Sequence, residues 1–142
     1  MIEKAIENWH SFLRGNFELD DLIHEECVFF SPVVFKPLKG RDLTKMYLNA
    51  AYKVFPGDED NQENNDLSTG SGSFNYTKYI LNENHAALEF ETIIDGIEIN
   101  GVDIISCDDE GLITEFKVMI RSRKAIDKIQ NQMASMIESM SL

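Results

Sequence analysis

Positively charged side chains are scarce in this sequence. Only 13 lysines and arginines stand against 25 aspartates and glutamates, so the formal net charge of the 142 residues is −12 at pH 7. Nucleic acids and anionic membrane surfaces attract cationic proteins and repel acidic ones. We therefore expect neither nucleic acid nor a membrane as a partner.

Long apolar runs are also missing. No stretch is long enough to cross a bilayer, and the opening MIEKAIENWH lacks the pattern of a secretion signal. The only two cysteines, Cys27 and Cys107, have no metal-ligand spacing, and the three histidines are scattered. We expect buried free thiols in a reducing cytoplasm, no metal site and no cofactor.

Apolar residues make up 43% of the chain and aromatic residues 10%, which is typical of a globular protein. The length predicts one domain over residues 1–142. Within it, residues 56–67 (PGDEDNQENNDL) are acidic and free of aromatics, so we expect a mobile loop there.

Hydrophobic spacing predicts the other elements. Helices are expected over residues 1–14, 17–24, 41–54 and 123–140, where apolar side chains recur every three or four positions. Short strands are expected over 27–30 and 33–38, and a longer one over 68–81.

Two hairpins dominate the stretch from Ala86 to Ile120. Asp95-Gly96 between alternating segments is a strong signal for a two-residue turn. That turn places Leu88 opposite Asp103 and Phe90 opposite Gly101. A second turn at residues 108–111 pairs Cys107 with Leu112, which sets Asp103 opposite Phe116.

The strand before these hairpins is expected to pair Leu81 with Ala86. Lys78 then lies opposite Glu89, Tyr79 opposite Leu88 and Thr77 opposite Phe90. The opposite charges of Lys78 and Glu89 favour this register. It makes Tyr79 a neighbour of Asp103, one strand away.

Side chains alternate between the two faces of a strand, and these registers gather apolar residues on one face. Asp103 is the exception there. A buried carboxyl group is costly unless it is paired, hydrogen-bonded or protonated. It is either a structural group bonded to a tyrosine hydroxyl or a helix end, or an acid that faces a ligand.

For the second alternative, the candidate catalytic residues are Asp103 and, as hydrogen-bond donor, Tyr79 or Tyr47. The candidate pocket for a small hydrophobic ligand comprises Trp9, Phe30, Tyr47, Leu88, Phe90, Ile99, Gly101, Phe116, Val118 and Ile120.

Three motifs carry a family resemblance. They are FFSPVV at residues 29–34, LEFE at 88–91 before Asp95-Gly96, and NGVDII at 100–105 followed by DEGLI and EFKVM. With them the chain resembles the nuclear transport factor 2-like superfamily, specifically its SnoaL-like branch. The resemblance implies an α+β cone-shaped barrel. Three N-terminal helices pack on a strongly curved, mixed but mostly antiparallel sheet, and a C-terminal helix follows.

The resemblance also bears on function. Ketosteroid isomerases of this superfamily keep a pocket aspartate where Asp103 falls, but their general base precedes the first-strand proline, and here that residue is Ser31. Steroid isomerisation is therefore not expected. SnoaL-type polyketide cyclases use a pocket aspartate as acid and base, which fits Asp103. The epoxide hydrolases need an Arg–Asp pair, and Arg121 is expected on the other face.

Three functions remain open. The chain is an isomerase, cyclase or hydratase (a lyase) acting on a small apolar carbonyl or enol compound, or it is a non-catalytic binder of a hydrophobic ligand. The third is an interaction module that forms a homodimer, compatible with either. Its interface is the outer sheet face, with Glu89, Glu91, Val102, Lys117, Met119 and Arg121.

Overall fold

The structure, a computed structural model, describes residues 1–55 and 74–140 of the chain. The expected loop at 56–67 and the first part of the expected strand at 68–81 lie outside these residues. The helices are α1 (Ile2–Leu13), α2 (Arg41–Val54), α3 (Arg123–Met140) and a short 3₁₀ turn, η1 (Leu19–Asp21). The strands are β1 (Ile23–Phe30), β2 (Leu38–Lys39), β3 (Asn75–Asn82), β4 (His85–Ile94), β5 (Ile97–Cys107) and β6 (Ile113–Arg121).

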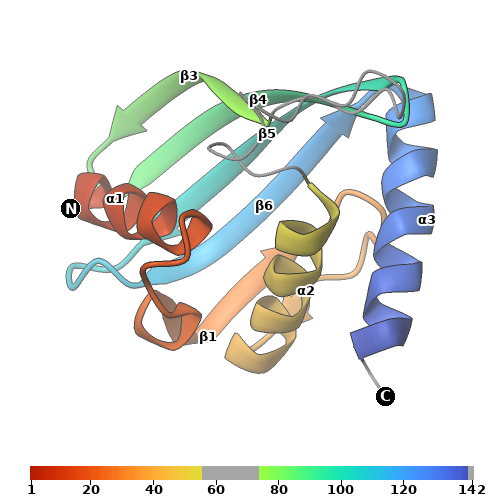
Figure 1. Ribbon diagram of the computed structural model, residues 1–142. Coiled ribbons are helices and arrows are strands. Elements are labelled where there is room, and N and C mark those ends of the chain that lie inside the picture. Colours follow the sequence, from red (N-terminus) through yellow and green to blue (C-terminus); the bar gives the residue numbers. More distant parts are fainter. Residues whose placement is uncertain (56–73, 141–142) are drawn as a thin grey trace.

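The strands form one sheet in the order β2-β1-β6-β5-β4-β3. Only β1 and β6 run parallel among the described strands, and the other neighbours are antiparallel. The sheet is curled but not closed, and all three α-helices lie against the same side of it (Figure 1). This arrangement confirms the expected α+β cone.

The hairpin between β4 and β5 has the predicted register. Asp95 and Gly96 both have positive φ, +51° and +79°, as a two-residue turn of this kind requires. Leu88 consequently pairs with Asp103 and Phe90 with Gly101. The Asp95 carboxylate forms an ion pair with Lys128 of α3, which ties this turn to the C-terminal helix.

The hairpin between β5 and β6 is shifted by two residues from the prediction. Asp103 pairs with Val118, not Phe116, and a bulge separates the pairs at Ser106 and Cys107. The turn accounts for one residue of the shift, since Cys107 pairs with Ile113 instead of Leu112, and the bulge accounts for the other. In the turn, the Asp108 carboxylate accepts hydrogen bonds from the backbone N–H groups of Glu110 and Leu112. Because a shift of two keeps every side chain on its face, the predicted faces survive.

Strand β3 departs from the prediction at one point. Lys78 pairs with Glu89 and Tyr79 with Leu88, as expected, but a bulge then places Tyr76 opposite Phe90 instead of Thr77. The extra residue on β3 brings the Tyr76 side chain to the concave face.

The helix predicted over residues 17–24 is wrong. Only the 3₁₀ turn η1 forms there, and β1 already begins at Ile23, which is buried and pairs with Ile113 of β6. The strand predicted over 33–38 is also reduced to β2, since Pro32 and Pro37 cannot donate to a strand ladder. The predictions for α1, α2 and α3 are confirmed, with α2 and α3 matching their expected bounds.

Candidate functional site

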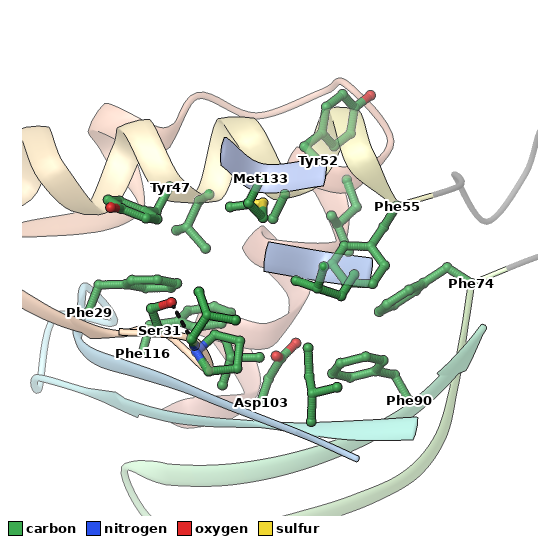
Figure 2. A pocket seen from close by; sticks show the side chains of 18 of the residues that line it. Phe29, Ser31, Tyr47, Tyr52, Phe55, Phe74, Phe90, Asp103, Phe116 and Met133 are labelled. Atoms are coloured by element: carbon green, nitrogen blue, oxygen red, sulfur yellow. Dashed lines mark hydrogen bonds between the residues drawn. The ribbon is translucent and has the colours of Figure 1, made fainter. Parts of the chain in front are cut away.

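A cavity lies between the concave face of the sheet and the helices. Its walls come from α1, α2, α3 and strands β1, β3, β4, β5 and β6, and nine of its side chains are aromatic. Tyr47, Phe55 and Phe90 are among those that surround Asp103 in Figure 2. The lining residues are Trp9, Leu13, Phe29, Ser31, Pro32, Val33, Tyr47, Leu48, Ala51, Tyr52, Phe55, Phe74, Tyr76, Phe90, Asp103, Phe116, Val118, Ile120, Ile129 and Met133.

Asp103 is the only acidic or basic side chain among these lining residues. It stands on the central strand β5, and its carboxyl group points from the sheet into the cavity, towards α2 (Figure 2). Its neighbours on the adjacent strands, Leu88 and Val118, are apolar. Its environment therefore offers almost no solvation, and the residue is 5% exposed.

A chain of hydrogen bonds holds the Asp103 carboxyl group. The Tyr76 hydroxyl donates to Oδ2 of Asp103 at 2.6 Å, and the indole Nε1 of Trp9 donates to the same hydroxyl at 2.9 Å. Trp9 comes from α1 and Tyr76 from β3, so three distant parts of the sequence meet at this point. The hydrogen bond from Tyr76 is the tyrosine bond expected if Asp103 is a structural group. The carboxyl group also lines the cavity, as expected if Asp103 is an acid that faces a ligand.

Burial dominates the electrostatics of the site. It raises the pKa of Asp103 from 3.8 to about 7, although the hydrogen bond from Tyr76 acts in the opposite direction. Burial, and next the neighbouring Asp103 charge, also raise the pKa of Tyr76 well above its ordinary value. Near neutral pH, Asp103 is therefore present in both protonation states, as a group that gives and takes protons requires.

Tyr79, the sequence candidate for a donor to Asp103, lies elsewhere. Its side chain is 45% exposed and does not line the cavity. Its hydroxyl lies 2.8 Å from Nε2 of His10, on the outer side of the contact between α1 and β3. Tyr79 keeps its predicted partner Leu88, but the bulge gives Tyr76 the place that an unbroken register assigns to Thr77, so Tyr76 is the tyrosine that reaches Asp103.

Six of the predicted pocket residues line the cavity, and four do not. Those in the lining are Trp9, Tyr47, Phe90, Phe116, Val118 and Ile120. Phe30 points to the other face of the sheet, where the Lys117 ammonium lies 4.6 Å from its ring centroid. Leu88 and Ile99 are buried in the packed core, and Gly101 has its Cα against the Phe90 ring.

Several lining residues were not predicted. On β1, side chains alternate between the two faces of the sheet, so Phe29 faces the cavity because Phe30 faces away from it. On α2 and at its end, helical spacing could have predicted the lining residues Leu48, Ala51, Tyr52 and Phe55. Tyr76 left no such signal, because a bulge is not visible in the hydrophobic pattern. Ser31 also lines the cavity, and its Oγ accepts a hydrogen bond from the backbone N–H of Val33.

Across residues 1–55 and 74–140, no three histidine, cysteine or acidic side chains gather as ligands for a metal ion. None of the helices in this part of the chain has the length and apolar character needed to cross a membrane.

Comparison with known proteins gives structural likeness only. No family model matches the sequence, and no curated protein does. A steroid delta-isomerase from Pseudomonas aeruginosa is 25% identical with a TM-score of 0.80, covering 98% of this chain and 93% of that one.

Two further solved structures share the fold at lower identity. An NTF2-like protein of unknown function from Mesorhizobium loti is 19% identical with a TM-score of 0.61, covering 84% of this chain and 93% of its own. SalBIII, an epoxide hydrolase/cyclase-like enzyme of pyran ring formation in polyether salinomycin, is 14% identical with a TM-score of 0.56, covering 84% and 88%.

Proposed function

We propose that this chain, which resembles the nuclear transport factor 2-like superfamily and its SnoaL-like branch in both motifs and fold, is an acid–base enzyme for a small apolar carbonyl or enol compound. It would be of the isomerase or cyclase type. One observation carries this proposal: Asp103 is the single carboxyl group in the lining of a mostly apolar, aromatic cavity. Its burial there raises its pKa to about 7.

The lining supports an uncharged, mostly apolar ligand. Aromatic walls bind flat hydrocarbon surfaces well, and they offer no counterion for a second charge. The polar atoms that Asp103 presents suit one polar tip on the ligand, such as a carbonyl oxygen. The Tyr47 hydroxyl is a further polar group of the lining, on the α2 side.

A lone carboxyl group suits a reaction in which one proton is removed and later returned. Asp103 as carboxylate takes a proton from the carbon that lies between a carbonyl group and a β,γ carbon–carbon double bond, and the C–H electron pair forms a dienolate. The same group, now the acid, returns the proton to the γ carbon, so that the double bond moves next to the carbonyl group and no atom is gained or lost. A pKa near the working pH favours both halves of such a cycle.

The residue at the position of the ketosteroid isomerase base supports a scheme in which Asp103 is the only group that transfers protons. Ser31 occupies that position, and its oxygen already accepts a hydrogen bond from the Val33 backbone N–H. A serine hydroxyl without an adjacent base does not remove a proton from carbon. The proposal therefore assigns both proton transfers to Asp103.

The test uses 3-cyclohexen-1-one, a small ketone whose conversion to the conjugated 2-cyclohexen-1-one is followed by ultraviolet absorbance. Binding is followed by the fluorescence of Trp9, the only tryptophan of the chain and a wall of the cavity. We expect conversion by the wild type and a loss of about 100-fold or more in Asp103→Asn, the usual range for acid–base catalysis.

A matched control is Asp109→Asn, which removes an exposed carboxylate in the turn between β5 and β6 and keeps an oxygen that can accept the hydrogen bond from Asn84. This variant should convert the ketone like the wild type. Equal conversion by wild type and Asp103→Asn would contradict the enzymatic role. Quenching of Trp9 by the saturated cyclohexanone, without any conversion of the unsaturated ketone, would instead identify a non-catalytic binder.

The outer face of the sheet favours a second role, homodimer formation. Ile80 and Met119 are 61% and 48% exposed there, beside a shallow hollow lined also by Lys78, Glu89 and Arg121. Both charge signs occur on this face, so two copies can approach despite a net charge of −12.

Sedimentation equilibrium tests the dimer. Met119→Glu should shift the protein to the monomer if this face is the interface. Leu43→Glu changes a residue of α2 that is 40% exposed, away from the hollow, and should leave the association unchanged. A monomeric wild type, or an unchanged dimer in Met119→Glu, would contradict this role.

The cytoplasm is the location we propose. Cys27 and Cys107 are both free and buried. Unpaired thiols are usual in a reducing compartment, where disulfides are rare. Cell fractionation with an antibody to the protein checks this, and recovery from an oxidising compartment would contradict it.

A further inference from the structure

The hydroxyl of Tyr76 has two neighbours that constrain the position of its own proton. On one side is Nε1 of Trp9 at 2.9 Å, and on the other is Oδ2 of Asp103 at 2.6 Å. An indole nitrogen carries a hydrogen and can only donate, so the contact with Trp9 uses a lone pair of the Tyr76 oxygen. The direction of the hydrogen bond between Tyr76 and Asp103 then depends on which acceptor the hydrogen of the Tyr76 hydroxyl can reach.

Two arrangements are conceivable for the Tyr76–Asp103 bond when Asp103 is protonated. Either Tyr76 donates to Oδ2, or Oδ2 carries the proton and donates to Tyr76. In the second arrangement the Tyr76 oxygen accepts twice and its own hydrogen needs another acceptor. Among the described residues, the hydrogen bonds of this hydroxyl are those with Trp9 and Asp103. Since a buried donor without a partner is costly, the first arrangement is favoured.

We propose that Trp9 is a positioning residue which, through Tyr76, keeps the carboxyl proton of Asp103 on Oδ1, the oxygen left for the cavity. Trp9 fills one lone pair of the Tyr76 oxygen and makes its O–H a stronger donor. Tyr76 then occupies Oδ2, and the acid form of Asp103 presents its O–H to the ligand. The Trp9 indole acts on the reacting group without itself exchanging a proton.

This inference rests on the proposed function and deepens it. At Oδ1, Asp103 donates a hydrogen bond to the ligand in its acid form and accepts one in its carboxylate form. Without Trp9 both lone pairs of the Tyr76 oxygen are free and its O–H is a weaker donor, so the preference of the Asp103 proton for Oδ1 becomes smaller. The ligand class favoured by the acid form therefore carries a hydrogen-bond acceptor, as a carbonyl oxygen does.

The surroundings of Asp103 allow a clean test. Tyr76 is the titratable group in direct contact with it, while the adjacent strands contribute Leu88 and Val118, which carry no charge. Tyr79 and His10 pack against the Tyr76 ring on its far side, with ring centroids 5.9 Å and 5.6 Å away. The helices α2 and α3 place Tyr47, Ile129 and Met133 around the cavity.

The experiment is a double-mutant cycle on the ligand-free protein, with the pKa of Asp103 measured by carbon-detected NMR. Tyr76→Phe removes the bond to the carboxylate and should raise the pKa by about one unit. Trp9→Phe weakens Tyr76 as a donor and frees it to accept, so the pKa should rise by about half a unit. In the Tyr76→Phe background, Trp9→Phe should have no further effect, because Trp9 acts only through Tyr76.

The control for lost packing is Phe116→Leu, which removes a cavity ring that packs edge-on to Trp9 at 5.0 Å and has no hydrogen bond to give. Its effect on the pKa should be the same with and without the Tyr76 hydroxyl. If Trp9→Phe behaves like this control, with an equal shift in both backgrounds, Trp9 is a packing residue and the proposal is overturned.

A second measurement needs no variant, so it tests the proposal even if Trp9→Phe fails to fold. The single indole N–H proton resonance of the wild type belongs to Trp9. It should shift with a midpoint at the pKa of Asp103, since the hydrogen bonds connect them. An indole resonance that ignores this titration overturns the proposal. Neither readout uses turnover, so the positioning role and the enzymatic role can fail independently.

Discussion

The backbone of Gly101 lies directly against the ring of Phe90. A Cβ atom on Gly101 would stand 2.4 Å from Cζ of Phe90 and 2.8 Å from the backbone oxygen of Met119. Both distances are shorter than van der Waals contact. The absence of a side chain at this position on β5 therefore determines where the Phe90 ring sits in the cavity wall.

We predict that Gly101→Ala lowers the free energy of unfolding by about 1–3 kcal/mol, the usual cost of overpacking. The added methyl group pushes the Phe90 ring towards the cavity and presses on the Met119 carbonyl of β6. Urea unfolding followed by Trp9 fluorescence measures the loss.

A second-site change separates the two contacts. Phe90→Leu removes Cζ, so the double variant should regain part of the stability lost in Gly101→Ala. If Gly101→Ala is as stable as the wild type, the close approach of Gly101 and Phe90 does not exist in solution.

The pKa of Asp103 predicts a pH dependence of stability. In the unfolded chain this group ionises near its ordinary value of 3.8, but in the folded protein it holds its proton to about pH 7. Between these values the folded state binds more protons, so the free energy of unfolding falls as pH rises and levels off above about pH 7. The contribution of Asp103 to this fall is about 4 kcal/mol.

Asp103→Asn isolates that contribution, since its amide cannot ionise and its oxygen can still accept from Tyr76. The variant and the wild type should be similarly stable near pH 4, and the variant more stable near pH 8. Chemical denaturation across this range measures the difference. A difference that does not change with pH would show that Asp103 titrates normally.

Tyr79→Phe should leave the pKa of Asp103 unchanged. The Tyr79 hydroxyl contacts Nε2 of His10 at 2.8 Å, and the donor to Asp103 is Tyr76. Carbon-detected NMR of the carboxyl group gives the comparison, with Tyr76→Phe as the positive control. If Tyr79→Phe raises the pKa of Asp103 as much as Tyr76→Phe does, Tyr79 is a hydrogen-bond donor to Asp103, as the sequence predicted.

Both cysteines should react slowly with a thiol reagent such as DTNB. Cys27 has no exposed surface and a pKa raised by burial to about 11, while Cys107 is 6% exposed with a pKa also raised by burial. We expect labelling at least about 100-fold slower than in urea, where both thiols are open to the reagent. Fast labelling of the native protein would contradict their burial.

The sequence predicted those parts of the site that depend on local pattern. Asp95-Gly96 defines its own turn, so the pairing of Leu88 with Asp103 followed from residues close in the chain. The position of Tyr76 did not, because a bulge in β3 changes the register without a mark in the hydrophobic pattern. The two-residue shift beyond Asp103 had a similar origin, in a bulge at Ser106 and Cys107 and in the turn that the Asp108 side chain stabilises.

Long-range pairing was the other source of error. Residues 17–24 show helical spacing, yet Ile23 joins a strand because Ile113, ninety positions later, offers it a partner. Local propensity gave no indication of that contact. The predicted pocket residue on β1 was wrong by one position for the same reason, because Phe29 faces the cavity and Phe30 faces away from it.

The parallel pairing of β1 with β6 has a consequence for how the cavity forms. Strands β3 to β6 are joined by hairpins, so their pairing requires only short loops to close. The ladder between β1 and β6 joins residues near the two ends of the chain, and such contacts form slowly because a long loop must be closed first. We therefore expect the sheet around Asp103 to assemble early, and the enclosed, water-poor environment that makes it a weak acid to arise only in the last folding step.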